Sequence, residues 1–220
     1  MRTIWIITFL AMACSANAGP WLRPDGDGFM SLDSIGSIGR DQGDLSAYSG
    51  LFAEYGLSDI TTFGFVGGID QANNGNATAY LKWQGPAVSE NWITAFNLGL
   101  GANFDADGSH PHLRIGTSLG RGGLFQTQRG WTQFDAFLLI GSGQQIRAKL
   151  EATLGTRGAK DWIYLLQLFA QSNTENGWDY ELAPSIAVPL KRKRHLQIGL
   201  LANTQDVGRI GLKAALWNEF

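Results

Sequence analysis

The feature that most constrains the fold is a two-residue alternation of apolar and polar side chains that recurs along the chain. It is clearest between residues 146 and 154, where the apolar set is Ile146, Ala148, Leu150, Ala152 and Leu154, and the set between them is Arg147, Lys149, Glu151 and Thr153. Successive side chains of a β-strand point to opposite faces, so this period predicts a strand with one apolar and one polar face. Such segments from residue 28 onward predict twelve strands, with ten or fourteen as the nearest alternatives.

The last of these segments, residues 208–220, runs to the end of the chain. Phe220 carries the terminal carboxylate, and alternate residues before it are apolar. Here the sequence resembles bacterial outer-membrane β-barrel proteins, whose final strand ends in phenylalanine after alternating apolar residues. The resemblance implies that Phe220 belongs to a signal read by the barrel-assembly machinery during insertion.

The N-terminal residues 1–18 are typical of a secretory signal peptide. Arg2 supplies the positive start, Ile4 to Ala13 the apolar run, and Ala16-Asn17-Ala18 a small-residue cleavage site. The next residues, 19–27, predict a short irregular lead-in on the periplasmic side. No later segment has 18 consecutive apolar residues, which excludes a spanning helix and leaves a soluble periplasmic β-protein or a membrane barrel.

The mature chain offers little material for a cofactor. Its only cysteine, Cys14, precedes the expected cleavage site, so neither a disulfide nor a thiolate metal site is available. Ala11-Met12-Ala13 before Cys14 lacks the large aliphatic residue of a lipoprotein signal. The basic run Lys191–His195 is interpreted as a solvated turn rather than a nucleic-acid or lipid site. We expect no cofactor, no metal and no nucleic-acid partner.

Charged residues provide an independent check on the faces. In the predicted strands after the first, eleven charged residues all fall opposite the apolar face, and we expect them to line the lumen of a barrel. They are Glu54, Asp70, Lys82, Arg114, Asp135, Arg147, Lys149, Glu151, Asp179, Glu181 and Lys213. A lipid-facing Lys or Arg at the bilayer midplane costs about 2–4 kcal/mol, whereas a lumen-facing one meets water or a partner. A soluble sandwich has the same alternation with charges outside, so periodicity does not separate the two folds.

The large aromatic residues do separate them. If the N-terminus is periplasmic, six aromatic residues fall at the periplasmic rim: Tyr55, Trp83, Trp92, Trp131, Trp162 and Trp217. Such a girdle is expected where a barrel crosses the membrane–water boundary. The sequence therefore predicts an all-β fold, a transmembrane antiparallel up-and-down barrel over residues 19–220, located in the outer membrane.

The segment Asp105–His112 is the one cluster that suggests catalysis or metal binding. Omptin-like proteases have Asp and His at the outer rim of a barrel, and outer-membrane phospholipase uses Ser and His, but neither motif matches this segment residue by residue. Pro111 is expected to keep His110 and His112 exposed without orienting them together. We interpret the segment as a polar surface loop and expect no enzyme activity, with an outer-membrane hydrolase as the less favoured alternative.

Two further segments, Gly19–Phe29 and Tyr55–Asp59, are similar to uncharacterised proteobacterial outer-membrane barrels, a resemblance that implies no particular activity. Twelve strands lie between small filled barrels and wide porins. We therefore expect a passive channel or transport-associated protein for small polar solutes, or alternatively a structural, envelope-organising barrel with a blocked lumen. Five basic and six acidic lumen residues predict no strong ion selectivity. Expected partners are outer-membrane lipid and lipopolysaccharide, and the oligomeric state is left open.

Overall fold

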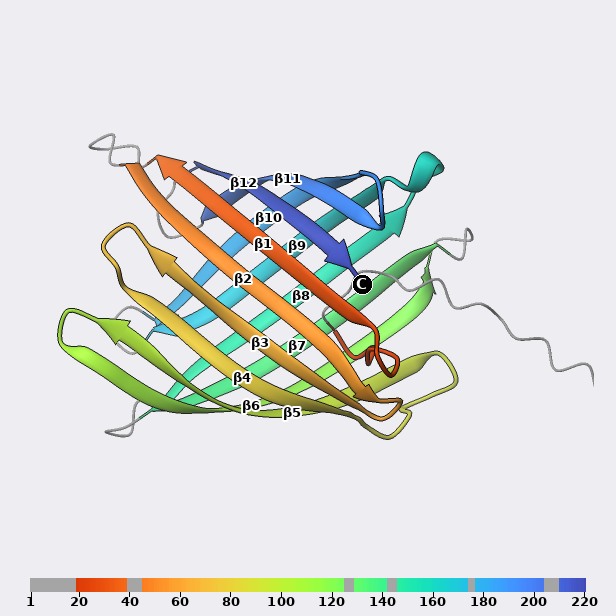
Figure 1. The fold of residues 1–220 in the computed structure, drawn as a ribbon, viewed down its shortest axis with the longest axis horizontal. Coiled ribbons are helices and arrows are strands. Elements are labelled where there is room, and N and C mark those ends of the chain that lie inside the picture. Colours follow the sequence, from red (N-terminus) through yellow and green to blue (C-terminus); the bar gives the residue numbers. More distant parts are fainter. Residues whose placement is uncertain (1–18, 39–44, 125–128, 142–145, 174–176, 204–209) are drawn as a thin grey trace, which may run out of the picture.

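A computed structural model describes residues 19–38, 45–124, 129–141, 146–173, 177–203 and 210–220. These residues form a closed antiparallel barrel of twelve strands, which confirms the predicted fold class and strand number (Figure 1). The strands are β1 (Gly28–Ile38), β2 (Leu45–Ser58), β3 (Thr61–Asp70), β4 (Gly75–Gln84), β5 (Trp92–Asp105), β6 (Gly108–Leu124), β7 (Gly130–Gly141), β8 (Ile146–Arg157), β9 (Ile163–Asn173), β10 (Gly177–Pro189), β11 (Arg194–Asn203) and β12 (Ile210–Glu219). One 3-10 turn, η2 (Ala159–Asp161), joins β8 to β9.

The barrel closes between its first and last strands. β1 and β12 pair from Phe29 opposite Glu219 to Ile38 opposite Ile210. The backbone of Phe220 extends this contact: its N–H donates to the Gly28 carbonyl at 3.0 Å, and its carbonyl accepts from the Gly28 N–H at 2.7 Å. Closure leaves no unpaired sheet edge, which is the condition for a β-structure to contact hydrocarbon. Within the described residues no helix is both long enough and apolar enough to span a bilayer.

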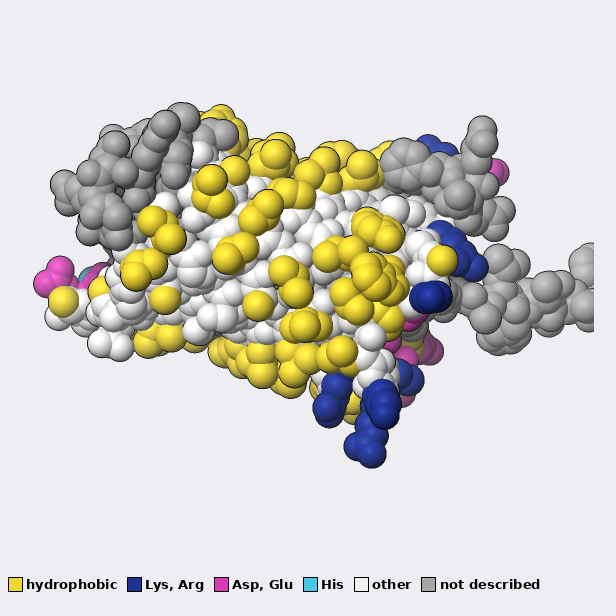
Figure 2. Space-filling view, turned by 90° about the horizontal axis from the view of Figure 1, so that it is seen from above, with side chains coloured by type: hydrophobic (Ala, Val, Ile, Leu, Met, Phe, Trp, Pro, Cys, Tyr) yellow, Lys and Arg dark blue, Asp and Glu magenta, His cyan; other side chains and the backbone are white. Residues whose placement is uncertain are grey.

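The outer surface of the barrel is apolar. Phe96, Leu150 and Leu212 are 49%, 46% and 63% exposed, and the same face of every strand carries further large hydrophobic side chains. Figure 2 shows them spread over the middle of one face, while the charged side chains in that view gather toward the ends. An exposed apolar surface of this extent indicates contact with lipid or another apolar partner.

The two ends of the barrel carry different connections. One end, which we call the strap end, holds Phe220 and the turns at 59–60, 85–91 and 190–193. The opposite end, which we call the loop end, holds the hairpin turns at 71–74 and 106–107. Asp70 closes the first of these hairpins, since its Oδ1 accepts hydrogen bonds from the N–H groups of Ala72 and Asn74 at 2.8 and 2.9 Å.

Residues 19–27, which we call the strap, lie inside the strap end of the barrel. The sequence predicts only an irregular lead-in here, but the strap crosses the lumen. β7 is six strands from β1 in either direction, so the two stand on opposite walls. A Cβ atom added to Gly19 would lie 2.5 Å from Oε1 of Gln133 on β7, and one added to Gly120 on β6 would lie 2.5 Å from Pro20. The strap therefore spans the lumen from β1 to the β6–β7 wall.

The base of the strap is fixed by a bulge in β2. The pairing of β2 with β3 shifts register between Gly56 and Ser58. At this bulge Gly56 donates its N–H to the Asp27 carbonyl at 2.9 Å and accepts from the Gly26 N–H at 3.0 Å. A side chain at Gly56 would overlap the carbonyl of Pro24. Glycine is required here because the backbone of the strap packs directly onto the wall.

An apolar core fills the lumen beside the strap. It consists of Phe29, Trp131, Ile163, Leu165, Ala187, Ala215 and Trp217, with Trp21 of the strap and Phe52 packed against it. Trp131 and Trp217 are only 4% and 8% exposed, so their predicted place in an outward aromatic girdle is wrong. The physical reason is their position in the alternation: both stand opposite the apolar outer residues of their strands, and they turn inward.

Candidate functional site in the barrel lumen

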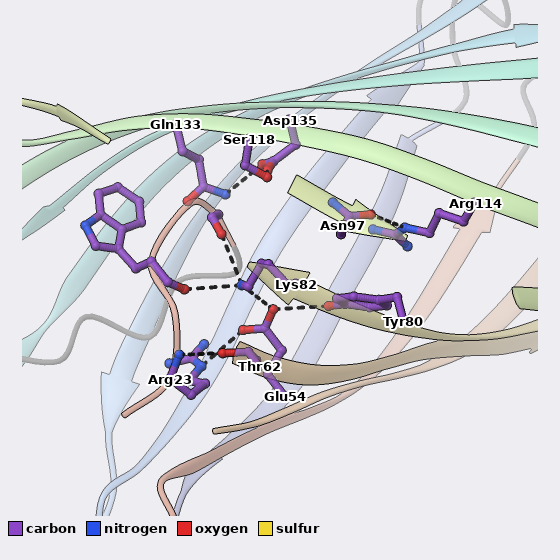
Figure 3. Close-up of polar contacts among 12 residues, drawn as sticks. Arg23, Glu54, Thr62, Tyr80, Lys82, Asn97, Arg114, Ser118, Gln133 and Asp135 are labelled. Atoms are coloured by element: carbon purple, nitrogen blue, oxygen red, sulfur yellow. Dashed lines mark hydrogen bonds and ion pairs between the residues drawn. The ribbon is translucent and has the colours of Figure 1, made fainter. Parts of the chain in front are cut away.

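Four side chains form a buried polar group beside the strap, which we call the Glu54 cluster: Arg23, Glu54, Tyr80 and Lys82 (Figure 3). Oε1 of Glu54 on β2 accepts from Nζ of Lys82 on β4 at 2.5 Å and from the hydroxyl of Tyr80 at 3.1 Å. Oε2 of Glu54 accepts from Nε of Arg23 at 3.1 Å. One carboxylate thus joins the strap to two strands of the wall.

The side chain of Lys82 also binds the backbone of the strap. Its ammonium donates to the carbonyls of Gly19 and Trp21 at 3.1 and 3.2 Å. On the other side, the N–H of Arg23 donates to Oγ1 of Thr62 at 2.8 Å. Buried charges are tolerated when they are paired and hydrogen-bonded, and this ammonium has three acceptors. The strap is therefore anchored by buried polar contacts as well as by apolar packing.

Arg114 on β6 lies beside the Glu54 cluster and contacts its Tyr80 ring. Its guanidinium lies 4.6 Å from the ring centroid of Tyr80 and 4.0 Å from that of Phe137. Its Nε donates to Oδ1 of Asn97 at 3.2 Å. A planar guanidinium stacks well on aromatic faces, so this side chain is held along the wall by three neighbours.

Two carboxylates stand side by side in the middle of the lumen. Asp135 on β7 pairs in register with Glu151 on β8. Asp135 accepts from the hydroxyl of Ser118 at 2.5 Å and from Nε2 of Gln133 at 3.2 Å. Both carboxylates line a cavity of about 120 Å³ that also borders the Glu54 cluster. Neither takes part in an ion pair with another described residue.

The loop end of the lumen is wider and more polar. A cavity of about 380 Å³ is lined there by Asp70, Asp179, Glu181, Tyr48 and Asn203, among others. Arg147 and Lys149 extend into the lumen from β8, near its loop end, and neither forms an ion pair with any residue that the structure describes. Arg147 borders a separate cavity of about 70 Å³, so this cation stands beside a space instead of being joined to an acidic partner.

All eleven charged residues predicted to face inward lie on the covered side of the wall. Glu54, Lys82 and Asp135 are buried. The other eight are half-buried: Asp70, Arg114, Arg147, Lys149, Glu151, Asp179, Glu181 and Lys213. The structure brings Glu54 and Lys82 into contact, but it places Asp70 at the hairpin that its own carboxylate closes. These positions are compatible with lumen lining, and their contact with a solute remains a proposal.

Sequence reasoning missed two charged residues. Asp33 lies on the inward face of β1, where a Cβ at Gly50 would lie 2.6 Å from its Oδ1. The facing of this strand depends on whether Phe29 or Met30 points inward, and the structure buries Phe29. The alternation of Ser31 and Asp33 with apolar neighbours was the available signal. Arg23 in the strap had no comparable signal, because the strap has no period.

The two histidines of the Asp105–His112 segment line one cavity of about 70 Å³ but have different hydrogen-bond partners. His110 is exposed, with Nε2 3.1 Å from Oδ1 of Asp105. His112 is buried, with Nε2 2.9 Å from Oγ1 of Thr78. The expectation that both are exposed is wrong for His112, because β6 begins at Gly108 and its pleat turns this ring inward. No group of three or more His, Cys, Asp or Glu side chains in the described part of the chain could hold a metal ion.

The other four predicted girdle residues point outward. Tyr55, Trp83 and Trp162 are 43%, 36% and 36% exposed. Trp92 is half-buried and stacks on Phe134, with ring centroids 6.5 Å apart. All four lie near the strap end, so an aromatic girdle at this boundary stays a prediction for these four residues.

Comparison with known proteins identifies the fold as one found in bacterial outer-membrane channels. The KdgM porin in complex with disordered oligogalacturonate superposes with a TM-score of 0.64 at 7% identity, covering 86% of this chain and 99% of that one. The NanC porin gives 0.64 at 8% identity, with 84% and 98% covered. An outer membrane channel from Pseudomonas putida F1 gives 0.62 at 12% identity, with 90% and 97% covered. No protein-family model and no curated protein matches the sequence. At sequence identities this low, the similarity to these proteins establishes the fold alone.

Proposed function

We propose that this protein is an outer-membrane channel for small polar solutes, closed at one end by the strap. The observation that carries the proposal is the polar, charged lumen of the loop half, which narrows onto a strap attached to the wall chiefly by the Glu54 cluster and the apolar core. Water and polar solutes can enter the loop half, and passage requires the strap to move aside.

The shape and surface of the barrel support this function. A closed barrel with an apolar exterior and enclosed charges is suited to a bilayer. The proteins that share the fold include porins and an outer membrane channel, and the KdgM porin is described in complex with oligogalacturonate. A polar lumen accessible to solutes is the property that this chain would share with them.

A structural barrel with a permanently blocked lumen is the second candidate. It is favoured by the apolar core at the strap end, where Trp217, Trp131 and Trp21 pack together. An apolar plug of this kind costs free energy to open, because its surface must be exposed to water. The two candidates differ in whether the strap can be displaced.

Planar-bilayer recording separates the two candidates. We expect the chain from residue 19 onward to show small or brief conductance, and deletion of residues 19–23 to raise the mean conductance at least severalfold. The deletion leaves Glu54 and Lys82 paired with each other, so the wall keeps its charge balance. Gly122→Ala, at a site where an added Cβ meets nothing within 4 Å, is the matched control and should conduct like the parent. Absence of current through both the parent and the deletion would establish a structural barrel.

We also propose that the protein is exported by residues 1–18, inserted by the barrel-assembly machinery, and surrounded by outer-membrane lipid and lipopolysaccharide. The support is the apolar exterior and the position of Phe220, which pairs with Gly28 at the closure. Deletion of Phe220 should leave the chain in the periplasm, as measured by fractionation and by the loss of heat-modifiable gel mobility. Normal insertion of the truncated chain would count against this role.

We propose further that the chain is not an enzyme. His110 contacts Asp105, while His112 contacts Thr78 inside the lumen, so the two rings have different hydrogen-bond partners. Proteins that share the fold include porins and a channel. If any hydrolase activity were found, its retention in the His110→Ala and His112→Ala variants would exclude this segment as its source.

A further inference from the structure

We propose that the loop half of the lumen binds solutes that carry both a carboxylate and an ammonium group, held between Lys149 and Asp179. This inference names the solute class of the proposed channel and therefore rests on that function for its physiological meaning. The binding itself is independent of whether the strap opens.

The strand register sets the spacing of the two charges. Lys149 on β8 is paired with Gln171 on β9, and Gln171 is paired with Asp179 on β10. The three residues therefore form one row across neighbouring strands, and all three are half-buried on the inward face. Adjacent strands lie about 4.8 Å apart, so the Cα atoms of Lys149 and Asp179 are separated by about 10 Å. The proposed zwitterion bridges these two side chains across the position of Gln171.

Further groups that can bind a carboxylate lie near Lys149. Arg147 shares the inward face of β8 with Lys149, two residues closer to the loop end. Arg147 and His112 line a cavity of about 70 Å³. The His112 ring is 5% exposed, and its Nδ1 is buried without a hydrogen-bond partner among the described residues. A buried ring nitrogen without a partner is costly to leave unsatisfied, and a ligand carboxylate or its water could supply one.

At the other end of the row, the Asp179 carboxylate can bind an ammonium group. Asp179 lines the cavity of about 380 Å³, and its Oδ1 accepts from Nδ2 of Asn203 at 2.8 Å. An ionised carboxylate has about four lone-pair positions, so one amide donor leaves it able to accept from an ammonium group. The Asn203 contact fixes the carboxylate in the lumen, where an ammonium group on the solute can reach it.

The arrangement favours zwitterions over solutes with one charge. Lys149 and Asp179 form no ion pair with each other or with another described residue. At a separation of about 10 Å, close to the screening length of about 8 Å in physiological salt, neither charge neutralises the other effectively. An anion attracted to Lys149 is repelled by Asp179, and a cation experiences the reverse. A zwitterion is attracted at both ends.

Ligand-observed saturation-transfer NMR on the folded chain in detergent tests this directly, with a size-matched set of probes: 4-aminobutyrate, pentanoate, pentylammonium and pentanamide. We expect 4-aminobutyrate to bind at least threefold more tightly than each of the others. Lys149→Gln should weaken 4-aminobutyrate binding about tenfold and remove its advantage over pentylammonium. Asp179→Asn should weaken it similarly and remove its advantage over pentanoate. Heat-modifiable gel mobility confirms that each variant is folded.

The exchange variant Lys149→Asp with Asp179→Lys provides the sharpest control. A zwitterion can reverse its orientation, so we expect the exchange to restore binding to within about threefold of the parent. Lys191→Gln, in a turn at the strap end, should bind like the parent. Equal binding of all four probes, or an exchange variant as weak as the single variants, would overturn the inference. Zwitterion binding without conductance in any variant would refute the channel function but support the binding site. Conductance without preferential zwitterion binding would support the channel function but refute the binding site.

Discussion

The two halves of the lumen are enclosed by the same twelve strands but differ in the side chains that point inward. At the strap end, inward residues such as Trp217, Ile163 and Phe29 pack into an apolar core, and the Glu54 cluster joins its charges in short contacts. At the loop end, Lys149 and Asp179 form no ion pair with a described residue, and Asp179 borders a cavity. The outer face is apolar over both halves. The inward face alone therefore decides which half of a barrel is closed and which admits water.

This contrast also shows that buried and open charges follow different rules. In the closed half the buried charges of the Glu54 cluster have partners, because leaving a charge unpaired out of water costs several kcal/mol. In the loop half water can supply the missing partners, so unpaired charges are tolerated and are available to a solute. Four substitutions test this contrast, with expected effects that decrease from the first to the last.

The largest effect is expected for Glu54→Gln. The change leaves the ammonium of Lys82 and the guanidinium of Arg23 buried without their carboxylate, and it should lower the free energy of unfolding by about 3–5 kcal/mol. Urea titration in lipid vesicles, followed by tryptophan fluorescence, measures it. Glu151→Gln is the matched control, because this carboxylate is half-buried in the middle of the lumen and forms no ion pair with another described residue, and it should change the same quantity by less than about 1 kcal/mol. Equal losses in both variants would remove the distinction between paired and unpaired charges in the lumen.

Trp217→Ala should come next. Trp217 packs against Phe29 with ring centroids 6.0 Å apart, and truncation leaves a cavity in the core, at a cost of about 3 kcal/mol in unfolding free energy. Trp162, near the same end but pointing outward, is its control: Trp162→Ala should lose less than half as much in the same urea titration. A larger loss at Trp162 would show that lipid contact, not the inner core, dominates this end.

Gly120→Ala should displace the strap without touching its polar anchors. The added methyl would meet Pro20 and Trp21, and overpacking of this kind costs about 1–3 kcal/mol. We expect faster chymotrypsin cleavage after Trp21, followed by mass spectrometry. Gly122→Ala on the same strand adds a methyl where nothing lies within 4 Å, and it should be cleaved at the parental rate. Identical rates in both variants would mean that the strap is not seated against β6.

Arg147→Gln should have the smallest effect on stability. Its guanidinium forms no ion pair with another described residue, so the free energy of unfolding should stay within about 0.5 kcal/mol of the parent in the urea titration. The residue borders the solute space, however, and its loss should shift the reversal potential in a salt gradient toward cation preference. A loss of stability above about 2 kcal/mol would show that charges in the loop half are structural.

Much of the wall could be predicted from the sequence because strand pleating is local. The faces of Leu150 and Lys149 follow from their immediate neighbours, and the same rule predicted the faces of the strands after β1. The alternation also places Trp131 and Trp217 on the inward face, as the structure does. The girdle prediction was wrong for these two residues because it used only their position near the strand ends. His112 was misjudged because β6 extends further toward its hairpin than the apolar pattern reveals.

The strap could not be predicted, and with it most of the closed half. Residues 19–27 have no period, and their partners are remote in the sequence: Arg23 contacts Glu54, and the Gly19 carbonyl contacts Lys82. Such contacts depend on closure of the whole barrel, which brings β1 and β7 to opposite walls. Two prolines and two glycines indicate an irregular segment, but nothing in their spacing says whether it lies inside or outside the barrel.

Thiol accessibility tests the contrast between the halves most directly, because the chain after residue 18 has no cysteine of its own. Lys149→Cys and Ala187→Cys place one thiol in each half of the lumen, and a charged, membrane-impermeant thiol reagent is added outside intact cells. We predict rapid labelling at position 149 and labelling at least tenfold slower at position 187, which is fully buried in the apolar core. Comparable labelling rates at the two positions would contradict the division of the lumen into a closed and an open half.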